Sequence, residues 1–252
     1  MDKKKSKILV LVEGPRTDVL LMKHLLDIYG ISQSHQIVSY NTNIYTLYNR
    51  MFRDGNPETI DILQVLKERE FDPEKRKILD EKYSDILLIF DLDPQAPDYS
   101  ADKIVEMMDY FVESSDMGKL YLNYPMVEAF YHMKQIPDED YNSYFATLVE
   151  LKNKAYKSRV NAENRNHDYT KFAVDKKECD IVIKQNIDKA FGIIGESDYD
   201  ENTLPDATDI LNAQINKIQL EKLVSILCTC VFYIPEYNPK LLTPYDTPST
   251  SG

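Results

Sequence analysis

Two stretches of sequence decide the fold: KILVLVEGPRTD at Lys7–Asp18 and DILLIFDLDPQ at Asp85–Gln95. Each begins with an apolar run rich in β-branched residues, which is typical of a strand buried on both faces of a parallel sheet. The first run ends at Glu13, and the second ends at Asp91 and Asp93. Because ligands bind at the carboxyl edge of open α/β sheets, the pattern predicts three carboxylates at one ligand-binding edge.

Carboxylates that crowd together repel one another unless a hard cation lies between them. The sequence therefore predicts a Mg²⁺ (or Mn²⁺) site formed by Glu13, Asp91 and Asp93, and with it phosphate chemistry. Taken separately, each motif has an ordinary interpretation, because strands and turns often end in acidic residues. Two acidic strand ends in this order, with Gly14 directly after Glu13, favour a shared site.

The order of these motifs resembles the Toprim family, a metal-binding domain of topoisomerases, bacterial primases and overcoming-lysogenization-defect (OLD) nucleases. In that family a Glu follows the first strand, usually before Gly, and a D-x-D motif follows a later strand. The matching residues here are Glu13 with Gly14, and Asp91 with Asp93. The resemblance covers Lys7 to Met133 and implies a Toprim-like Rossmannoid parallel sheet flanked by helices. It also implies that Asp91 and Asp93 bind metal, with Glu13 as a ligand or general acid/base.

The length and cysteine content of the chain exclude some branches of this family. Its 252 residues are too few for a topoisomerase, and it has no zinc-ribbon cysteines like those of bacterial primases. It resembles the standalone, OLD-like Toprim nucleases of bacterial anti-phage defence, including the nuclease subunit of the phage anti-restriction-induced system. That resemblance implies a toxic, Mg²⁺-dependent endonuclease that cuts DNA or RNA, transfer RNA included, under the control of a partner ATPase. Two alternatives stay open: a non-catalytic metal- or nucleotide-binding regulator, and a protein-interaction subunit.

Four further residues are auxiliary candidates for the site. Gly14 would let the backbone approach a phosphate closely. Arg16 lies beside the same loop and would either contact a phosphate or pair with Asp18. Glu128 follows a third expected strand and either joins the acidic edge or merely benefits from a helix dipole. His132 lies four residues further on, either as a structural histidine or as a proton-transfer partner of Glu128.

The net charge of −12 argues against a free, indiscriminate nuclease, because nucleic-acid binding normally needs a basic footprint. Bound metal, a locally basic face or a partner protein would each compensate. The best candidates for a basic face are Lys152, Lys154, Lys157, Arg159 and Arg165.

Cysteine usage and hydropathy indicate the cellular compartment. Cys179, Cys228 and Cys230 form no disulfide framework and are expected to be buried thiols in a reducing environment. We expect neither a signal peptide nor a membrane segment of about 20 apolar residues. These features predict a soluble, cytoplasmic protein without a membrane partner.

The remaining patterns predict a Toprim-like domain over residues 1–135, a mainly helical region over 136–240 and a disordered tail over 241–252. The helical region is where we expect the surface for a partner or for a homodimer. Expected strands are Gln36–Tyr40 and Lys119–Tyr124, and expected helices are Val19–Tyr29 after an N-cap at Thr17-Asp18, Asn43–Phe52, Glu58–Glu70, Ser100–Glu113, Asp138–Lys157 and Ala213–Tyr233.

Overall fold

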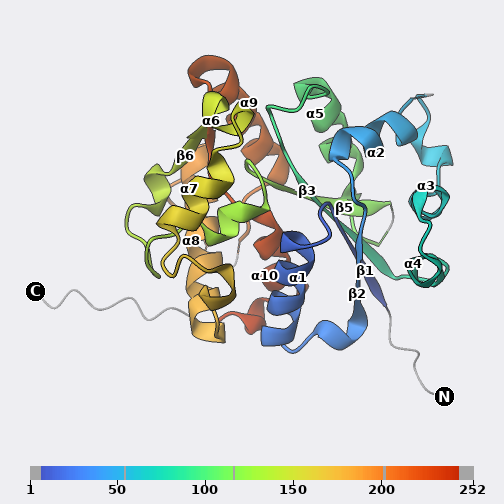
Figure 1. The fold of residues 1–252 in the computed structure, drawn as a ribbon, viewed down its shortest axis with the longest axis horizontal. Coiled ribbons are helices and arrows are strands. Elements are labelled where there is room, and N and C mark those ends of the chain that lie inside the picture. Colours follow the sequence, from blue (N-terminus) through green and yellow to red (C-terminus); the bar gives the residue numbers. More distant parts are fainter. Residues whose placement is uncertain (1–6, 54, 116, 201–202, 244–252) are drawn as a thin grey trace, which may run out of the picture.

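The computed structural model describes residues 7–53, 55–115, 117–200 and 203–243. They form a five-stranded sheet of order β2-β1-β3-β5-β4 with helices on both faces (Figure 1). Four strands are parallel and β4 is an antiparallel edge strand. The predicted α/β class with a largely parallel sheet is therefore confirmed. The strands are β1 (Ile8–Val12), β2 (His35–Ser39), β3 (Asp85–Asp91), β4 (Val112–Glu113) and β5 (Gly118–Asn123).

The two decisive stretches form the centre of the sheet. β1 pairs with β3 from Ile8 opposite Asp85 to Val12 opposite Ile89, and Asp91 lies opposite Asn123 of β5. Every residue of β1 is buried, as are all residues of β3 after the first. Burial on both faces explains why these strands are continuous apolar runs rather than alternating ones.

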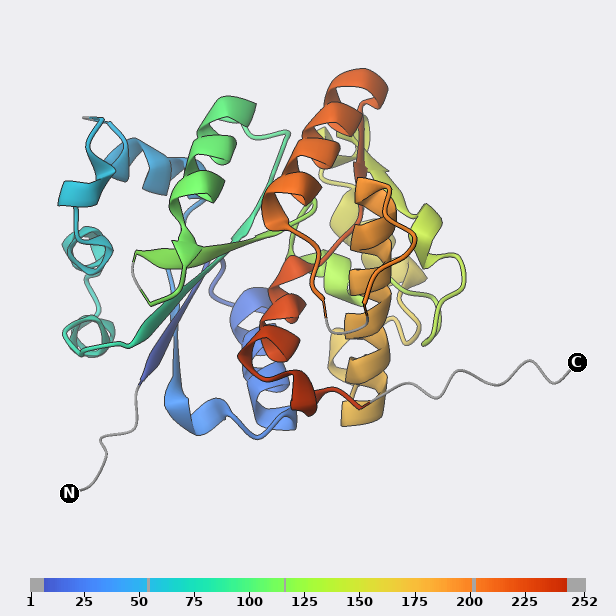
Figure 2. The same ribbon diagram turned by 180° about the vertical axis from the view of Figure 1, so that it is seen from behind.

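Helices cover the two faces of the sheet. On one face lie α1 (Thr17–Ile28) and α10 (Tyr233–Tyr237), where the Tyr233 ring meets Tyr121 of β5 at a centroid distance of 6.2 Å. The other face carries four helices, and Figure 2 gives the view from behind. These are α2 (Ile44–Met51), α3 (Ile62–Arg69), α4 (Pro73–Leu79) and α5 (Ala101–Tyr110).

The C-terminal region is less helical than expected. The predicted helix Asp138–Lys157 is wrong, because strand β6 (Phe145–Thr147) lies within it and pairs with β7 (Leu223–Ser225). The predicted helix Ala213–Tyr233 is also wrong beyond Glu221, where Lys222 adopts φ 61° and ends the helix. The helices of this region are α6 (Leu148–Lys152), α7 (Tyr156–Glu163), α8 (Lys176–Ile194) and α9 (Ala207–Glu221).

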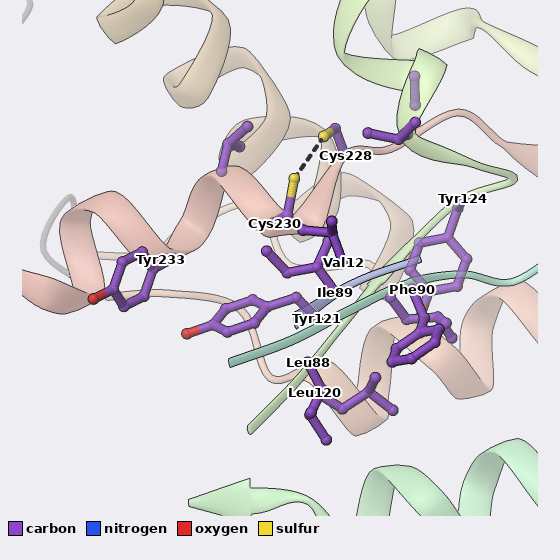
Figure 3. Close-up of a cluster of buried hydrophobic side chains, with 14 of the residues drawn as sticks. Val12, Leu88, Ile89, Phe90, Leu120, Tyr121, Tyr124, Cys228, Cys230 and Tyr233 are labelled. Carbon is purple, nitrogen blue, oxygen red and sulfur yellow. Dashed lines mark hydrogen bonds between the residues drawn. The ribbon is translucent and has the colours of Figure 1, made fainter. Parts of the chain in front are cut away.

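The C-terminal region packs against the sheet and shares its hydrophobic core. Tyr124 and Leu227 exchange two backbone hydrogen bonds of 2.8 Å, and Thr229 donates to the Leu122 carbonyl. Figure 3 shows the buried thiols of Cys228 and Cys230 above the same strands. The boundary after residue 135 remains a prediction, and residues 244–252 of the predicted disordered tail lie outside the described part of the chain.

Within the described ranges, we find no helix that combines the length and the apolar character needed to cross a membrane.

Candidate metal centre

The carboxyl edge of the sheet brings the three predicted acids together. Glu13 follows β1, its N–H donates to the Ile89 carbonyl at 3.0 Å, and its Oε2 accepts from the Asp91 N–H at 3.2 Å. Asp93 lies two residues further on in the left-handed region at φ 44°, a conformation that Asp tolerates better than most residues. The Gln95 amide donates to its Oδ1 at 2.9 Å. The strand order alone accounts for this meeting.

A cavity of about 320 Å³ opens at this edge. Its wall combines acidic residues from the ends of β1 and β3 with two lysines from the segment around α7. It is lined by Glu13, Gly14, Asp18, Asp91, Asp93, Gln95, Met126, Leu151, Lys154, Tyr156 and Lys157. The cavity therefore offers both carboxylate oxygens and ammonium groups to a ligand.

Asp18 belongs to this cavity, although the sequence predicted an N-cap at Thr17-Asp18. Helix α1 begins at Thr17 after Arg16, without a side-chain cap, and the Asp18 carboxylate points back towards Gly14, whose backbone lowers its pKa. A Cβ on Gly14 would lie 2.5 Å from Asp18 Oδ2, so a side chain here would displace the Asp18 carboxylate. Gly14 thus makes space for an acid, while the predicted approach to a phosphate remains a prediction.

Glu128 also joins the acidic cluster. It lies in a 3₁₀ turn (Val127–Tyr131) and is only 2% exposed. Its Oε1 pairs with Lys157 Nζ at 2.8 Å, and its Oε2 has no hydrogen-bond partner among the described residues. Its charge raises the pKa of both Asp18 and Asp91. Of the two readings of Glu128, the structure favours membership of the acidic edge.

The burial and proximity of these carboxylates favour their protonated forms. Burial, with help from Asp93, raises the pKa of Glu13 to about 8. Burial raises the pKa of Asp18 to about 6 and holds the pKa of Asp91 well above its usual value. The pKa of Asp93 is raised as well, again chiefly by burial. Such a cluster keeps protons that a divalent cation would displace.

Lys157 is the principal cation of the cluster. Burial of its ammonium lowers the pKa, but Glu128, Asp91 and Asp18 outweigh that effect and raise it above the usual value. Lys157 also lowers the pKa of Glu13 and of Asp93. The sequence singled out Lys157 as part of a basic face, and its place among the acids was not predicted.

The donor chemistry of the cavity suits Mg²⁺, which prefers hard carboxylate oxygens. Two buried oxygens, Asp18 Oδ1 and Glu128 Oε2, have no partner within the described residues and are available to a ligand. The carboxylates are not preassembled, however: no three His, Cys, Asp or Glu side chains in the described ranges form a group that could hold a metal ion. Metal binding would have to draw them together.

Arg16 and His132 do not join the site. Arg16 is exposed, and no ion pair joins it to Asp18 among the described residues. His132 is 1% exposed, bonds to Glu163 through Nε2 at 2.9 Å, and has its pKa lowered to about 4 by burial. Glu128 instead faces Lys157, so the structure favours the structural reading of His132.

The predicted basic face divides into two groups. Lys154 and Lys157 line the acidic cavity. Arg159 pairs with Glu150, and Arg165 pairs with Glu178, so both arginines are neutralised within the C-terminal region. Lys152 is exposed at the end of α6. The local cations of the site are therefore the two lysines.

Comparison of the chain with protein-family models, curated proteins and solved structures finds no match. The resemblance to the Toprim family accordingly remains a prediction from the motifs at Glu13, Asp91 and Asp93.

Proposed function

We propose that this chain is a metal-dependent, Toprim-type endonuclease that hydrolyses phosphodiester bonds in DNA or RNA. The observation that supports it most strongly is the meeting of Glu13 and Asp91, joined by a 3.2 Å hydrogen bond at the carboxyl edge of a parallel sheet. Asp93, Asp18 and two lysines share the same cavity. Paired acids beside cations suit a substrate that carries negative charge and needs a proton transfer.

In this proposal Asp91 and Asp93 would hold Mg²⁺ or Mn²⁺, with Glu13 either as a third ligand or as the general acid/base. A bound divalent ion supplies Lewis-acid polarisation of a phosphate oxygen. As a ligand Glu13 would be ionised; in the acid/base role, its pKa of about 8 in the metal-free protein lies in the range suited to moving a proton near neutral pH. Lys157 and Lys154 bind the non-bridging phosphate oxygens. Glu128 holds the Lys157 ammonium in position through the 2.8 Å ion pair.

We further propose that the enzyme is a toxic effector of anti-phage defence that a partner ATPase restrains. A net charge of −12 slows encounter with nucleic acid, which suits a nuclease that must stay harmless until released. The region from residue 136 onward contributes Leu151, Lys154, Tyr156 and Lys157 to the cavity wall and no predicted metal ligand, so we assign it the surface for the partner or for a homodimer.

A cleavage assay with matched variants tests the catalytic proposal. Purified chain is incubated with labelled DNA, RNA and transfer RNA in Mg²⁺, alongside Glu13→Gln and the exposed control Glu58→Gln. We expect wild type and Glu58→Gln to cut at least one substrate, and Glu13→Gln to cut none. Cleavage by Glu13→Gln at the wild-type rate would show that the edge carboxylates are not catalytic.

Expression tests the restraint. The chain is produced alone and together with its genomic neighbours, with and without phage infection. We expect toxicity from the chain alone that the neighbours suppress until infection. Equal toxicity under all conditions would refute the proposal that a partner restrains the chain. Toxicity that Glu13→Ala leaves unchanged would refute the proposal that the chain is a nuclease.

The alternative function is a non-catalytic metal- or nucleotide-binding subunit. The observation in its favour is that the described carboxylates do not form a preassembled metal site. Metal binding by calorimetry without any cleavage of nucleic acid would select this alternative.

A further inference from the structure

A second cavity, of about 240 Å³, lies between the ends of β1 and β2 and the helices α3 and α4. Figure 1 shows α3 and α4 at the β2 side of the sheet. Its floor is apolar and its rim is polar. It is lined by Leu11, Val38, Ser39, Tyr40, Asn41, Leu66, Arg69, Glu70, Phe71 and Leu79. Neither the predicted metal ligands nor the lysines of the acidic cavity take part in it.

The chain after β2 connects this cavity to the acidic one. The Tyr40 N–H donates to the Val12 carbonyl at 2.8 Å, and the Asn41 N–H donates to the Glu13 carbonyl at 2.9 Å. Asn41 is exposed and adopts φ 60°, so the loop turns sharply at the open edge. Asn41, which lines the second cavity, therefore lies beside Glu13, which lines the acidic one.

Arg69 gives this cavity a positive charge without a carboxylate partner among the described ion pairs. Its guanidinium lies over the Tyr40 ring, 5.5 Å from the centroid. The acid in the cavity wall, Glu70, has Lys75 Nζ 3.8 Å from its Oε2, and the same ammonium donates to Ser39 Oγ at 3.1 Å. Because Lys75 offsets Glu70, the charge of Arg69 is left for an anion.

Tyr40 supplies an independent observation. The residue is 8% exposed and lines the cavity, and the Arg69 guanidinium lies near its buried hydroxyl without a hydrogen bond of normal geometry. Buried hydroxyls are normally satisfied, so the Tyr40 hydroxyl at the cavity wall is available to a ligand oxygen.

Phe71 adds an aromatic ring to the mouth of this cavity. Its side chain is 89% exposed and lines the mouth of the cavity, so the ring is open to a stacking partner. An exposed aromatic beside an unpaired arginine and a hydroxyl is the combination that binds a nucleotide of a single strand, with the base stacked and the phosphate paired.

We propose that this second cavity is a nucleotide subsite for single-stranded nucleic acid that extends from the acidic cavity. Arg69 pairs with a backbone phosphate, the Tyr40 hydroxyl donates to a phosphate or sugar oxygen, and Phe71 stacks on a base. This proposal rests on the proposed nuclease function, because the bound strand is taken to run from the acidic cavity, where it is cut, to the second cavity. It adds a place where substrate is gripped away from the bond that breaks.

Binding in EDTA tests the subsite without cleavage. Fluorescence anisotropy measures the affinity of a labelled oligodeoxythymidylate of about 15 nucleotides for wild type and variants. We expect Arg69→Ala to weaken binding about tenfold and to reduce the salt dependence by about one ion. Phe71→Ala should also weaken binding about tenfold. The matched controls, Arg76→Ala on exposed α4 and Leu220→Ala on α9, should stay within about twofold of wild type.

Tyr40→Phe separates a binding role from a structural one. It should weaken binding while leaving the melting temperature unchanged or higher, because it removes a buried hydroxyl that lacks a partner. Loss of stability with unchanged binding would overturn the role of Tyr40.

Three outcomes would overturn the subsite. The first is that Arg69→Ala and Arg76→Ala bind the oligonucleotide with equal affinity. The second is that Phe71→Ala binds it as tightly as wild type does. The third is that thymidine monophosphate binds as tightly as the oligonucleotide, which would indicate a site for free nucleotides. Wild type that binds no nucleic acid would overturn both the subsite and the nuclease. Binding that depends on Arg69 without any cleavage in Mg²⁺ would overturn the nuclease and leave the subsite standing.

Discussion

Replacing Glu13 by Gln should stabilise the metal-free protein. The pKa of Glu13 rises from 4.5 to about 8 because the side chain is buried beside Asp93. The native state therefore takes up a proton that the unfolded chain does not hold, at a cost of about 3 kcal/mol at about pH 7. Gln removes the charge and keeps an oxygen for the Asp91 N–H. Because its NH₂ adds donors that the site must accommodate, we expect a net gain of about 1–3 kcal/mol.

The sign of the pH dependence is fixed by the direction of the pKa shift. A carboxyl whose folded pKa is raised gives its full stability below the unfolded value of 4.5 and loses it as pH rises through about 8. The advantage of Glu13→Gln should therefore be absent near pH 4.5, grow towards neutrality and level off above about pH 8. Wild type should lose stability over the same window.

Thermal and urea denaturation in EDTA, from about pH 5 to about pH 9, measures this effect. A gain of 1–3 kcal/mol corresponds to a rise in melting temperature of about 2–10 °C for a chain of this size. The exposed control Glu58→Gln should change little at any pH. A Glu13→Gln protein that is less stable than wild type near pH 8, or whose gain is the same at every pH, would refute the reasoning.

Two other substitutions probe the charges around the cavity. Lys157→Ala should destabilise the protein by about 1–3 kcal/mol, because it leaves the Glu128 carboxylate buried without its cation. Chemical denaturation measures this change in stability. An unchanged stability would mean that the ion pair does not stabilise the fold. His132 has its pKa lowered from 6.5 to about 4, so the unfolded chain binds its proton first and stability should fall as pH drops through that window. His132→Gln should flatten that part of the stability curve, and a curve as steep as that of wild type would contradict the buried neutral histidine.

The sheet could be predicted because its signal is local. β1 and β3 are buried on both faces, and such strands appear in the sequence as unbroken apolar runs. The acids at their ends follow from the same pattern, since neighbouring parallel strands end at one edge. For this reason the sequence alone predicts that Glu13, Asp91 and Asp93 lie together.

The C-terminal region could not be predicted in the same way, because its signals are distant in sequence. Phe145–Thr147 becomes a strand by pairing with Leu223–Ser225, a partner that no local window contains. Lys222 ends α9 with a positive φ, although Lys is a good helix former. Tertiary pairing outweighed local propensity in both segments.

Asp18 and Lys157 belong to the site because of the directions in which their side chains point, and the sequence does not reveal those directions. Asp18 reads as an N-cap beside Thr17, yet its carboxylate turns back towards the Gly14 N–H and the cavity. The signal that existed was Gly14 itself, whose missing Cβ leaves room for that carboxylate. Lys157 reaches the acids from α7, so its role depends on how the C-terminal region packs.

Mg²⁺-dependent cleavage by wild type and Asp91→Asn, compared side by side, tests the central claim most directly. Asn keeps an oxygen to accept from the Val127 N–H, which Asp91 Oδ1 now does at 2.8 Å, so the variant should fold and be at least as stable without metal. The account predicts that wild type cuts nucleic acid in Mg²⁺ but not in EDTA, and that folded Asp91→Asn cuts nothing. Cleavage by Asp91→Asn at the wild-type rate, or cleavage by wild type that persists in EDTA, would contradict it.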